Sequence, residues 1–208
     1  MRAAALSFLV IAGAGSTAAD LESLHIANVG LSIGGRTSVQ LHSRFRTNHR
    51  LGDFYQVRGG PVVQVRAAAR TTLIGGYYFI EQEDSSHRLY DQHRAFGGVQ
   101  QRTLDHRRVK LDVRWMGERF FAGPVADYWR LRNRLMATLP RDGWAPFVSG
   151  EALWVQNARW IGRYSAGAQR RIGAATVGLG YEFRQSVTGT GSHIMATYFQ
   201  FDALKPKR

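Results

Sequence analysis

Polar and apolar residues alternate along most of the chain from about residue 36 onward. Between Arg36 and Arg46 every even-numbered residue is polar, and the residues between them are mostly apolar. Successive side chains of a β-strand point to opposite faces, so this segment predicts a strand with one polar and one apolar face. A helix would distribute the same residues around its axis. The alternation recurs in residues 55–66, 108–118, 129–135, 163–171 and 177–184.

The predicted strands are long, and short connections alternate with longer ones. The strands run over roughly 10–14 residues, whereas strands of soluble proteins have about 5–6 and a tilted strand needs about 9–11 to cross a bilayer. Short turns at one end and longer loops at the other are typical of membrane barrels. The short connections contain residues 34–35, 67–69, 141–143 and 173–174, and the longer ones residues 47–53, 84–87, 122–127 and 188–192.

These patterns predict an all-β fold, a single antiparallel up-and-down transmembrane β-barrel of about 10–12 strands over residues 36–203. Residues 20–35 are a candidate first strand. Single-chain bacterial barrels have even strand numbers with both termini on the periplasmic side, so we expect ten or twelve strands. Gly59, Gly60 and Pro61 predict a bulge or a bend within one strand.

The first 19 residues have the features of a secretory signal peptide. Arg2 precedes an apolar run, and small residues lead up to Ala19. This order predicts Sec-type export with cleavage near Ala19, and the destination of an exported barrel is the outer membrane of a Gram-negative bacterium. A buried N-terminal helix is the alternative. At the other end of the chain, residues 204–208 form a basic tail.

The expected partners follow from that location. They are outer-membrane lipid and, during export, the barrel-assembly machinery. The last predicted strand, Ser192–Phe201, ends an apolar alternation on phenylalanine and resembles a closing strand, although Asp202–Arg208 follow it. Export argues against nucleic acid as a partner, despite the formal net charge of +13.

Aromatic residues cluster near the ends of the predicted strands. Tyrosine and tryptophan favour the membrane interface, since each ring is partly apolar and partly polar. The aromatic core of a soluble β-sandwich is the alternative. The clustered residues are Phe120, Phe121, Tyr128, Trp129, Trp144, Trp154 and Trp160.

Arginine dominates the polar face, because all but three of the 28 basic residues are arginines. A barrel has to turn this face inward, since arginine facing lipid at mid-depth costs about 2–4 kcal/mol. The predicted lumen arginines are Arg44, Arg58, Arg114, Arg130, Arg132, Arg134, Arg163, Arg171 and Arg184. Their predicted acidic partners are Asp112, Glu118, Glu151 and Glu182. Arg119 and Arg170 lie on the apolar face, where a side chain near a strand end can reach the interface.

Two roles are compatible with such a lumen. Arginine–carboxylate pairs would fill it and make a closed, structural barrel. Alternatively, excess arginine would line a narrow pore for small anionic solutes, because rings of positive charge select anions. A soluble periplasmic barrel or sandwich that binds an anionic ligand is a further alternative.

The sequence does not favour an enzyme. The segments Ser85-Ser86-His87 and Ser192-His193 are the candidates for an outer-membrane lipid hydrolase, but catalysis needs serine, histidine and an acid that converge in space. Neighbours in a strand point to opposite faces, as Ser192 and His193 would. Because metal-binding motifs, phosphate-binding glycine loops and cysteines are absent from the sequence, we expect no catalytic residue, cofactor or metal.

Several motifs follow one another in the C-terminal half. They are RWMGERF at Arg114–Phe120, RLRNRL at Arg130–Leu135, Pro146 with Glu151, Arg163, and Gly180-Tyr181. This order resembles the uncharacterised outer-membrane β-barrel family catalogued as domain of unknown function 2490. The resemblance covers residues 94–201, with Gly98–Arg102 fitting an upstream glutamine-rich strand. It implies an exported barrel and no particular activity.

Overall fold

Eleven β-strands account for most of the described chain. The computed structural model describes residues 21–48, 53–84, 86–123, 126–156, 159–186 and 191–204. The predicted signal peptide and the residues after Leu204 lie outside them. The strands are β1 (Leu21–Ile33), β2 (Thr37–Asn48), β3 (Asp53–Ala68), β4 (Thr71–Glu83), β5 (Leu89–Asp105), β6 (Lys110–Phe121), β7 (Tyr128–Thr138), β8 (Trp144–Val155), β9 (Arg159–Ile172), β10 (Ala175–Ser186) and β11 (Gly191–Leu204). Among these residues, no helix is long and apolar enough to cross a membrane.

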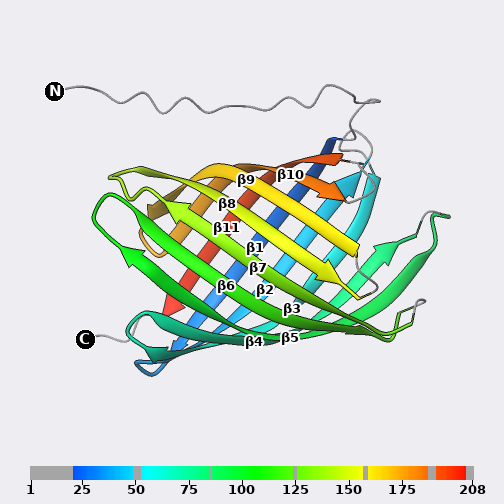
Figure 1. Ribbon diagram of the computed structural model, residues 1–208, viewed down its shortest axis with the longest axis horizontal. Coiled ribbons are helices and arrows are strands. Elements are labelled where there is room, and N and C mark those ends of the chain that lie inside the picture. The colour runs from blue at the N-terminus through cyan, green and yellow to red at the C-terminus, as the bar shows by residue number, and fades with distance from the viewer. Residues whose placement is uncertain are drawn as a thin grey trace.

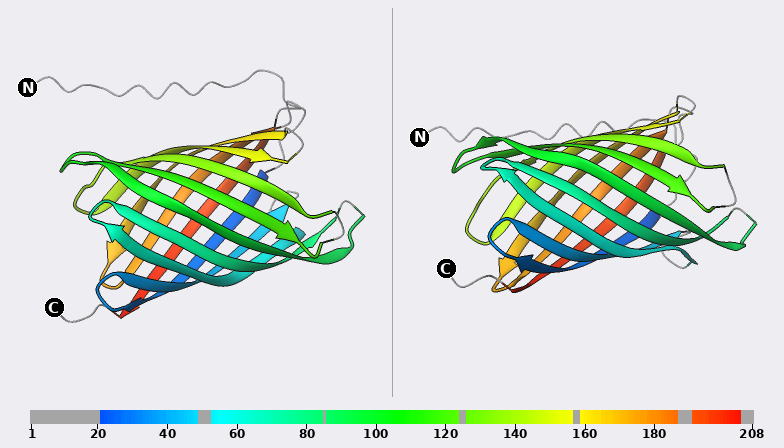
Figure 2. Two further views of the ribbon diagram at one scale, coloured as in Figure 1. Left: turned by 60° about the horizontal axis from the view of Figure 1, so that its bottom comes forward. Right: turned by 90° about the horizontal axis from the view of Figure 1, so that it is seen from below.

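The strands close into one barrel, in which each strand pairs with its neighbours in the sequence (Figure 1). Figure 2 shows the strands tilted across the barrel axis. The all-β, up-and-down barrel is therefore confirmed. Ten of the eleven pairings are antiparallel, and the closing pair of β1 with β11 is parallel, with Leu21 opposite His193 and Leu31 opposite Leu204.

The expectation of an even strand number is wrong. Residues 20–35 contribute β1, and with an odd number of strands the first and the last run in the same direction and must pair in parallel. Leu21 consequently lies at the end of the barrel that carries the longer connections, beside the start of β11. The end of β11 lies at the opposite end, beside the tight turns. The two ends of the described chain are thus on opposite sides of the barrel rather than on one side.

The tight turns and the interrupted pairing in β3 have specific glycine conformations. Gly34, Gly143 and Gly173 have positive φ angles of 72°, 93° and 59° in three of the turns. In β3 the pairing with β4 skips Gly60 and Pro61 without a change of register, so these residues do not form a bulge. A Cβ atom at Gly60 would lie 2.1 Å from the carbonyl oxygen of Tyr77, so only glycine fits there.

The outer face of the barrel is apolar over most of its surface. Its exposed apolar residues include Val29, Leu41, Val63, Leu73, Trp115, Leu131, Leu135, Val148, Leu179, Met195, Phe199 and Phe201. Trp129, Trp154 and Trp160 are exposed near the longer connections. The rings of Phe120 and Tyr128, in contrast, stack 4.5 Å apart, and Phe120 is buried.

The interior is not uniformly polar. One buried apolar cluster lies on β3 to β6, and a smaller one lies on β1 and β11. The first contains Val62, Ile74, Tyr78, Ile80, Phe96, Met116 and Phe120, and the second Leu24, Ile194 and Ala196. The interior wall of β3 to β6 therefore carries apolar side chains beside the polar ones, whereas the alternation predicted a polar inner face.

The loop from β4 to β5 is organised by Asp84. Its carboxylate accepts hydrogen bonds from the backbone N–H groups of Arg88 (3.0 Å) and Ser86 (2.8 Å) and from the Arg88 side chain (3.2 Å). The N–H group of Arg88, with smaller contributions from Ser86 and the Arg88 side chain, lowers the pKa of Asp84 below its ordinary value of 3.8.

A pH titration should reveal this lowered pKa. A carboxylate with a lowered pKa stabilises its loop above the ordinary pKa and loses that effect as the pH falls through the lowered one. We expect the Asp84 carboxyl resonance, followed by NMR, to titrate with a midpoint below 3.8. A midpoint at or above that value would contradict the hydrogen bonding of this loop.

Candidate functional site

The centre of the candidate site is Glu118, whose side chain in β6 is fully buried. Its carboxylate contacts the guanidinium groups of Arg130 at 2.5 Å, Arg132 at 2.9 Å and Arg94 at 3.6 Å. Arg130 lies directly opposite Glu118 on β7, and Arg132 follows two residues later on the same face. The alternation of the strands therefore directs all four side chains into the interior.

Further ion pairs continue from Arg132 around the wall. Arg132 contacts Glu151 of β8 at 2.5 Å, and Glu151 contacts Arg163 of β9 at 3.5 Å. Glu182 of β10 follows, 3.9 Å from Arg163 and 3.3 Å from Arg184. We refer to these eight residues on β5 to β10 as the ion-pair belt: Arg94, Glu118, Arg130, Arg132, Glu151, Arg163, Glu182 and Arg184.

The belt lies against the apolar cluster of β3 to β6. The guanidinium of Arg94 is 4.5 Å from the ring centroid of Tyr78, and that of Arg58 is 4.7 Å from the same ring. Arg130 lies 4.6 Å from the ring of Phe120. Arginine stacks well on aromatic faces because its planar charge is weakly hydrated. These ring contacts therefore add to the ion pairs of Arg94 and Arg130 with Glu118 in positioning the guanidinium groups.

Cations outnumber anions in this interior. Among the described residues, eleven buried or half-buried arginines of β2 to β10 face five carboxylates: Arg44, Arg46, Arg58, Arg94, Arg102, Arg114, Arg130, Arg132, Arg134, Arg163 and Arg184 against Glu22, Asp112, Glu118, Glu151 and Glu182. Arg44 donates to Gln56 at 2.9 Å, and Arg58 lies 3.1 Å from the Nε2 atom of His42. Arg114 and Arg134 form no ion pair among the described residues. The interior therefore carries an excess of positive charge.

Several of these guanidinium groups also have unused hydrogen-bonding capacity. Buried Nε atoms without a hydrogen-bond partner in the described structure belong to Arg44, Arg46, Arg58, Arg94, Arg114, Arg163 and Arg184. Buried donors are normally satisfied by protein groups or by water. These Nε–H groups can therefore hold water or an anion in the interior.

The structure brings together most of the residues predicted for the lumen, with two exceptions. Asp112 pairs with Arg102 near the tight turns, at 3.0 Å, and takes no part in the ion-pair belt. Arg171 is exposed at the end of β9, where its Nε–H group donates to the carbonyl oxygen of Gly173 at 3.1 Å. Arg119 is on the outer face and pairs with Asp127 at 3.1 Å.

Sequence reasoning missed four charged interior residues. Arg46 pairs with Glu22, Arg94 belongs to the belt, and Arg102 pairs with Asp112. Arg94 was not predicted as an interior residue because Phe96 and Gly98, on the same inner face of β5, interrupt the polar alternation. The even spacing of Gln92, Arg94, Gln100 and Arg102 was the available signal. Glu22 was not predicted as an interior residue because polar and apolar residues alternate little in β1.

Of the candidate serine–histidine pairs, Ser192 and His193 point to opposite faces, whereas His87 contacts Glu83 at 2.5 Å. Ser192 lies on the strand face that leads to buried Ile194, whereas the His193 ring on the other face contacts the hydroxyl of Tyr181. The backbone N–H of Ser86 donates to Asp84 in an exposed loop, and Ser85 lies outside the described residues. Within the described ranges, no group of three or more histidine, aspartate and glutamate side chains is placed to hold a metal ion.

Comparison with known proteins identifies one family. A family model described as "Protein of unknown function (DUF2490)" matches residues 23–199. The match reaches far upstream of the C-terminal motifs and covers the strands that carry the ion-pair belt. No curated protein and no solved structure matches the chain.

Proposed function

The chain belongs to the DUF2490 family of proteins of unknown function, and from that premise we propose that it is an outer-membrane β-barrel whose lumen passes small anions through a narrow, arginine-lined constriction. The excess of interior arginine over glutamate carries this proposal. Fixed positive charge in a low-dielectric passage attracts anions and repels cations.

The outer face supports a membrane location. Exposed aliphatic and aromatic side chains such as Val63, Leu131 and Leu179 occur on strands all round the barrel. Soluble proteins rarely expose contiguous apolar patches larger than a few hundred Å². The strands have 11 to 17 residues, enough for a tilted crossing of a bilayer. Lipid is the environment that such a surface favours.

The belt would form the constriction. Its Arg94 and Glu118 side chains are buried, so the passage is narrow at their level and conductance should be small. A barrel of about this strand number holds little open space once long side chains fill it. Only small solutes would pass, and the unpaired Nε–H groups would replace part of their hydration.

Substitution of Arg114 and Arg134 tests the role of the excess charge. The two residues lie opposite each other on β6 and β7, and neither forms an ion pair among the described residues. The double variant Arg114→Gln/Arg134→Gln therefore removes two positive charges without breaking a pair. In planar bilayers with a KCl gradient, we expect an anion-selective reversal potential for the unmodified protein and a clear shift toward zero for the variant.

Arg171→Gln is the matched control, because it removes an exposed charge outside the belt. Its reversal potential should equal that of the unmodified protein. Absence of any current from folded protein, or a cation-selective current, would refute the anion passage.

A closed structural barrel is the second candidate, favoured by the full burial of Glu118 among three arginines. The planar-bilayer recordings distinguish the closed barrel from the anion passage, because a closed barrel carries no current. Recovery of the protein in a salt-washed soluble fraction would instead support the soluble, anion-binding alternative.

A further inference from the structure

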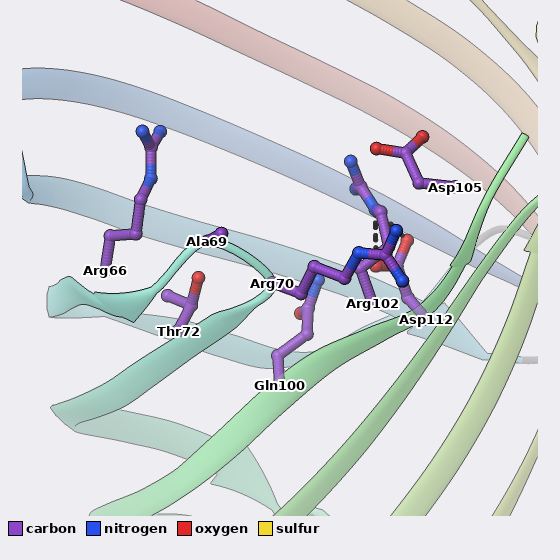
Figure 3. Close-up of a pocket in the computed structure, with 8 residues that line it drawn as sticks. All are labelled: Arg66, Ala69, Arg70, Thr72, Gln100, Arg102, Asp105 and Asp112. Atoms are coloured by element: carbon purple, nitrogen blue, oxygen red, sulfur yellow. Dashed lines mark hydrogen bonds and ion pairs between the residues drawn. The ribbon is translucent and has the colours of Figure 1, made fainter.

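A second charged site lies at the end of the barrel that carries the tight turns. It is a pocket of about 380 Å³ between the ends of β3 to β6, which we call the turn-end pocket. Its lining is Arg66, Ala69, Arg70, Thr72, Gln100, Arg102, Asp105 and Asp112 (Figure 3). Its strand positions share the inner face of the barrel, since Arg66 lies opposite Thr72, Thr72 opposite Gln100, and Arg102 opposite Asp112. The pocket therefore belongs to the mouth of the lumen and not to the outer, apolar surface.

Among the described residues, one arginine of the pocket has an ion-pair partner and two have none. Arg102 donates two hydrogen bonds to the carboxylate of Asp112, at 3.0 and 3.3 Å, which neutralises both groups and holds Arg102 in place. Arg66 and Arg70 form no ion pair or side-chain hydrogen bond within the described part of the chain. Figure 3 shows Arg66 on one side of the pocket and Arg70 on the other, beside Arg102. The pocket thus offers two uncommitted guanidinium groups on opposite sides.

The remaining polar groups indicate the kind of anion. A guanidinium binds phosphate and carboxylate oxygens through two parallel hydrogen bonds. Thr72 and Gln100 are neutral and can donate or accept. Asp105, whose nearest cation is Lys110 at 3.9 Å, has carboxylate oxygens free to accept from hydroxyl groups. This combination suits a ligand with an anionic group and several hydroxyl groups, and the volume is near the lower end of the range for small-molecule sites.

The pocket adjoins the arginine-lined interior along the inner face of β5 and β6. Gln100 in the pocket lies directly opposite Arg114, and Asp112 precedes Arg114 by two residues on the same face of β6. A solute bound in the turn-end pocket therefore lies close to Arg114 and to Arg134, which is opposite Arg114 on β7. Since cation-rich clefts raise the local concentration of anions, this mouth would concentrate them beside the belt.

We propose that the turn-end pocket is a binding site for a small phosphorylated polyol, of which a sugar phosphate is the simplest form. The phosphate binds between Arg66 and Arg70, whose exposed side chains can turn toward it from opposite sides, and Asp105 accepts hydrogen bonds from the hydroxyl groups. Only the role of this site in delivering solute to the belt rests on the proposed anion passage; the binding itself does not.

Binding to the refolded full-length protein in detergent micelles tests the site. Isothermal titration calorimetry with glucose 6-phosphate should give a measurable Kd, with weaker binding of inorganic phosphate and none of glucose. The variant Arg66→Gln/Arg70→Gln should raise the Kd for glucose 6-phosphate about tenfold or more, because it removes charge-assisted hydrogen bonds. Heat-modifiable migration on a denaturing gel establishes that each variant is folded.

Arg141→Gln is the matched control. Arg141 is exposed in the turn between β7 and β8, at the same end of the barrel, and does not line the pocket. Its substitution should leave the Kd unchanged. No binding of glucose 6-phosphate at millimolar concentration, equal binding by the Arg66/Arg70 variant, or equal affinity for inorganic phosphate would overturn the assignment. If the protein binds glucose 6-phosphate but carries no current, the binding site stands and the anion passage is refuted. If it carries an anion current but does not bind glucose 6-phosphate, the anion passage stands and the binding site is refuted.

Discussion

Replacing Glu118 with glutamine should lower the free energy of unfolding by about 3–5 kcal/mol. The carboxylate is fully buried and contacts Arg94, Arg130 and Arg132. Glutamine keeps the shape of the side chain but removes its charge, which leaves three guanidinium groups facing one another. Removing one partner from a buried charge network costs far more than breaking an exposed pair, because the remaining charges stay desolvated.

Urea titration of the protein in phospholipid vesicles, followed by tryptophan fluorescence, measures this loss. Asp105→Asn is the matched control. Its carboxylate is 3.9 Å from Lys110, with both side chains more than one-third exposed, so the change should be below about 1 kcal/mol. Equal midpoints for the Glu118 and Asp105 variants would contradict the central position of Glu118 in the ion-pair belt.

Introducing arginine at Leu179 should cost about 2–4 kcal/mol if the barrel lies in a membrane. Leu179 is 60 % exposed on the outer face, near the middle of β10. At that depth a guanidinium would have to leave water, or draw water and headgroups into the bilayer. The cost has no counterpart in a soluble barrel, where an exposed leucine can be replaced by arginine with little effect.

Ile33→Arg provides the comparison for this experiment. Ile33 is 59 % exposed and also faces outward, but it is the last residue of β1. Its arginine can reach the interface, so the expected cost falls to about 0–1 kcal/mol. Urea titration in vesicles should therefore separate the two variants by their depth. Equal stability of both variants would count against the membrane location.

The alternation of polar and apolar residues was sufficient to predict strands where polar residues occupy several successive positions of the inner face. It identified β7, whose Arg130, Arg132 and Arg134 face inward while Leu131 and Leu135 face outward. The contacts among these side chains depend on strand register and tilt, which the pattern does not contain. Spacing alone could not show that Glu118 contacts three arginines while Arg114 forms no ion pair among the described residues.

The alternation was less informative where the apolar residues face inward or where both faces are apolar. In β1 the inward residues Leu24 and Ile26 are apolar, whereas outward His25 is polar and contacts Thr197 at 2.7 Å. In β4, Ile74 and Tyr78 are buried in the interior cluster although Leu73 and Tyr77 face outward. A strand with apolar residues on both faces gives no period-two signal, so β1 remained a candidate and the interior cluster was not foreseen.

The parallel pairing of β1 with β11 has a consequence for how the molecule can be labelled and joined. Every other pairing is a hairpin between neighbours in the chain, whereas this one joins residues such as His25 and Thr197, which are 172 positions apart. Because Leu21 and Leu204 lie at opposite rims, no short linker can fuse the ends into a circular permutant. If the barrel spans a membrane as proposed, epitopes attached at the two ends of the strand sequence would report opposite compartments of a sealed vesicle.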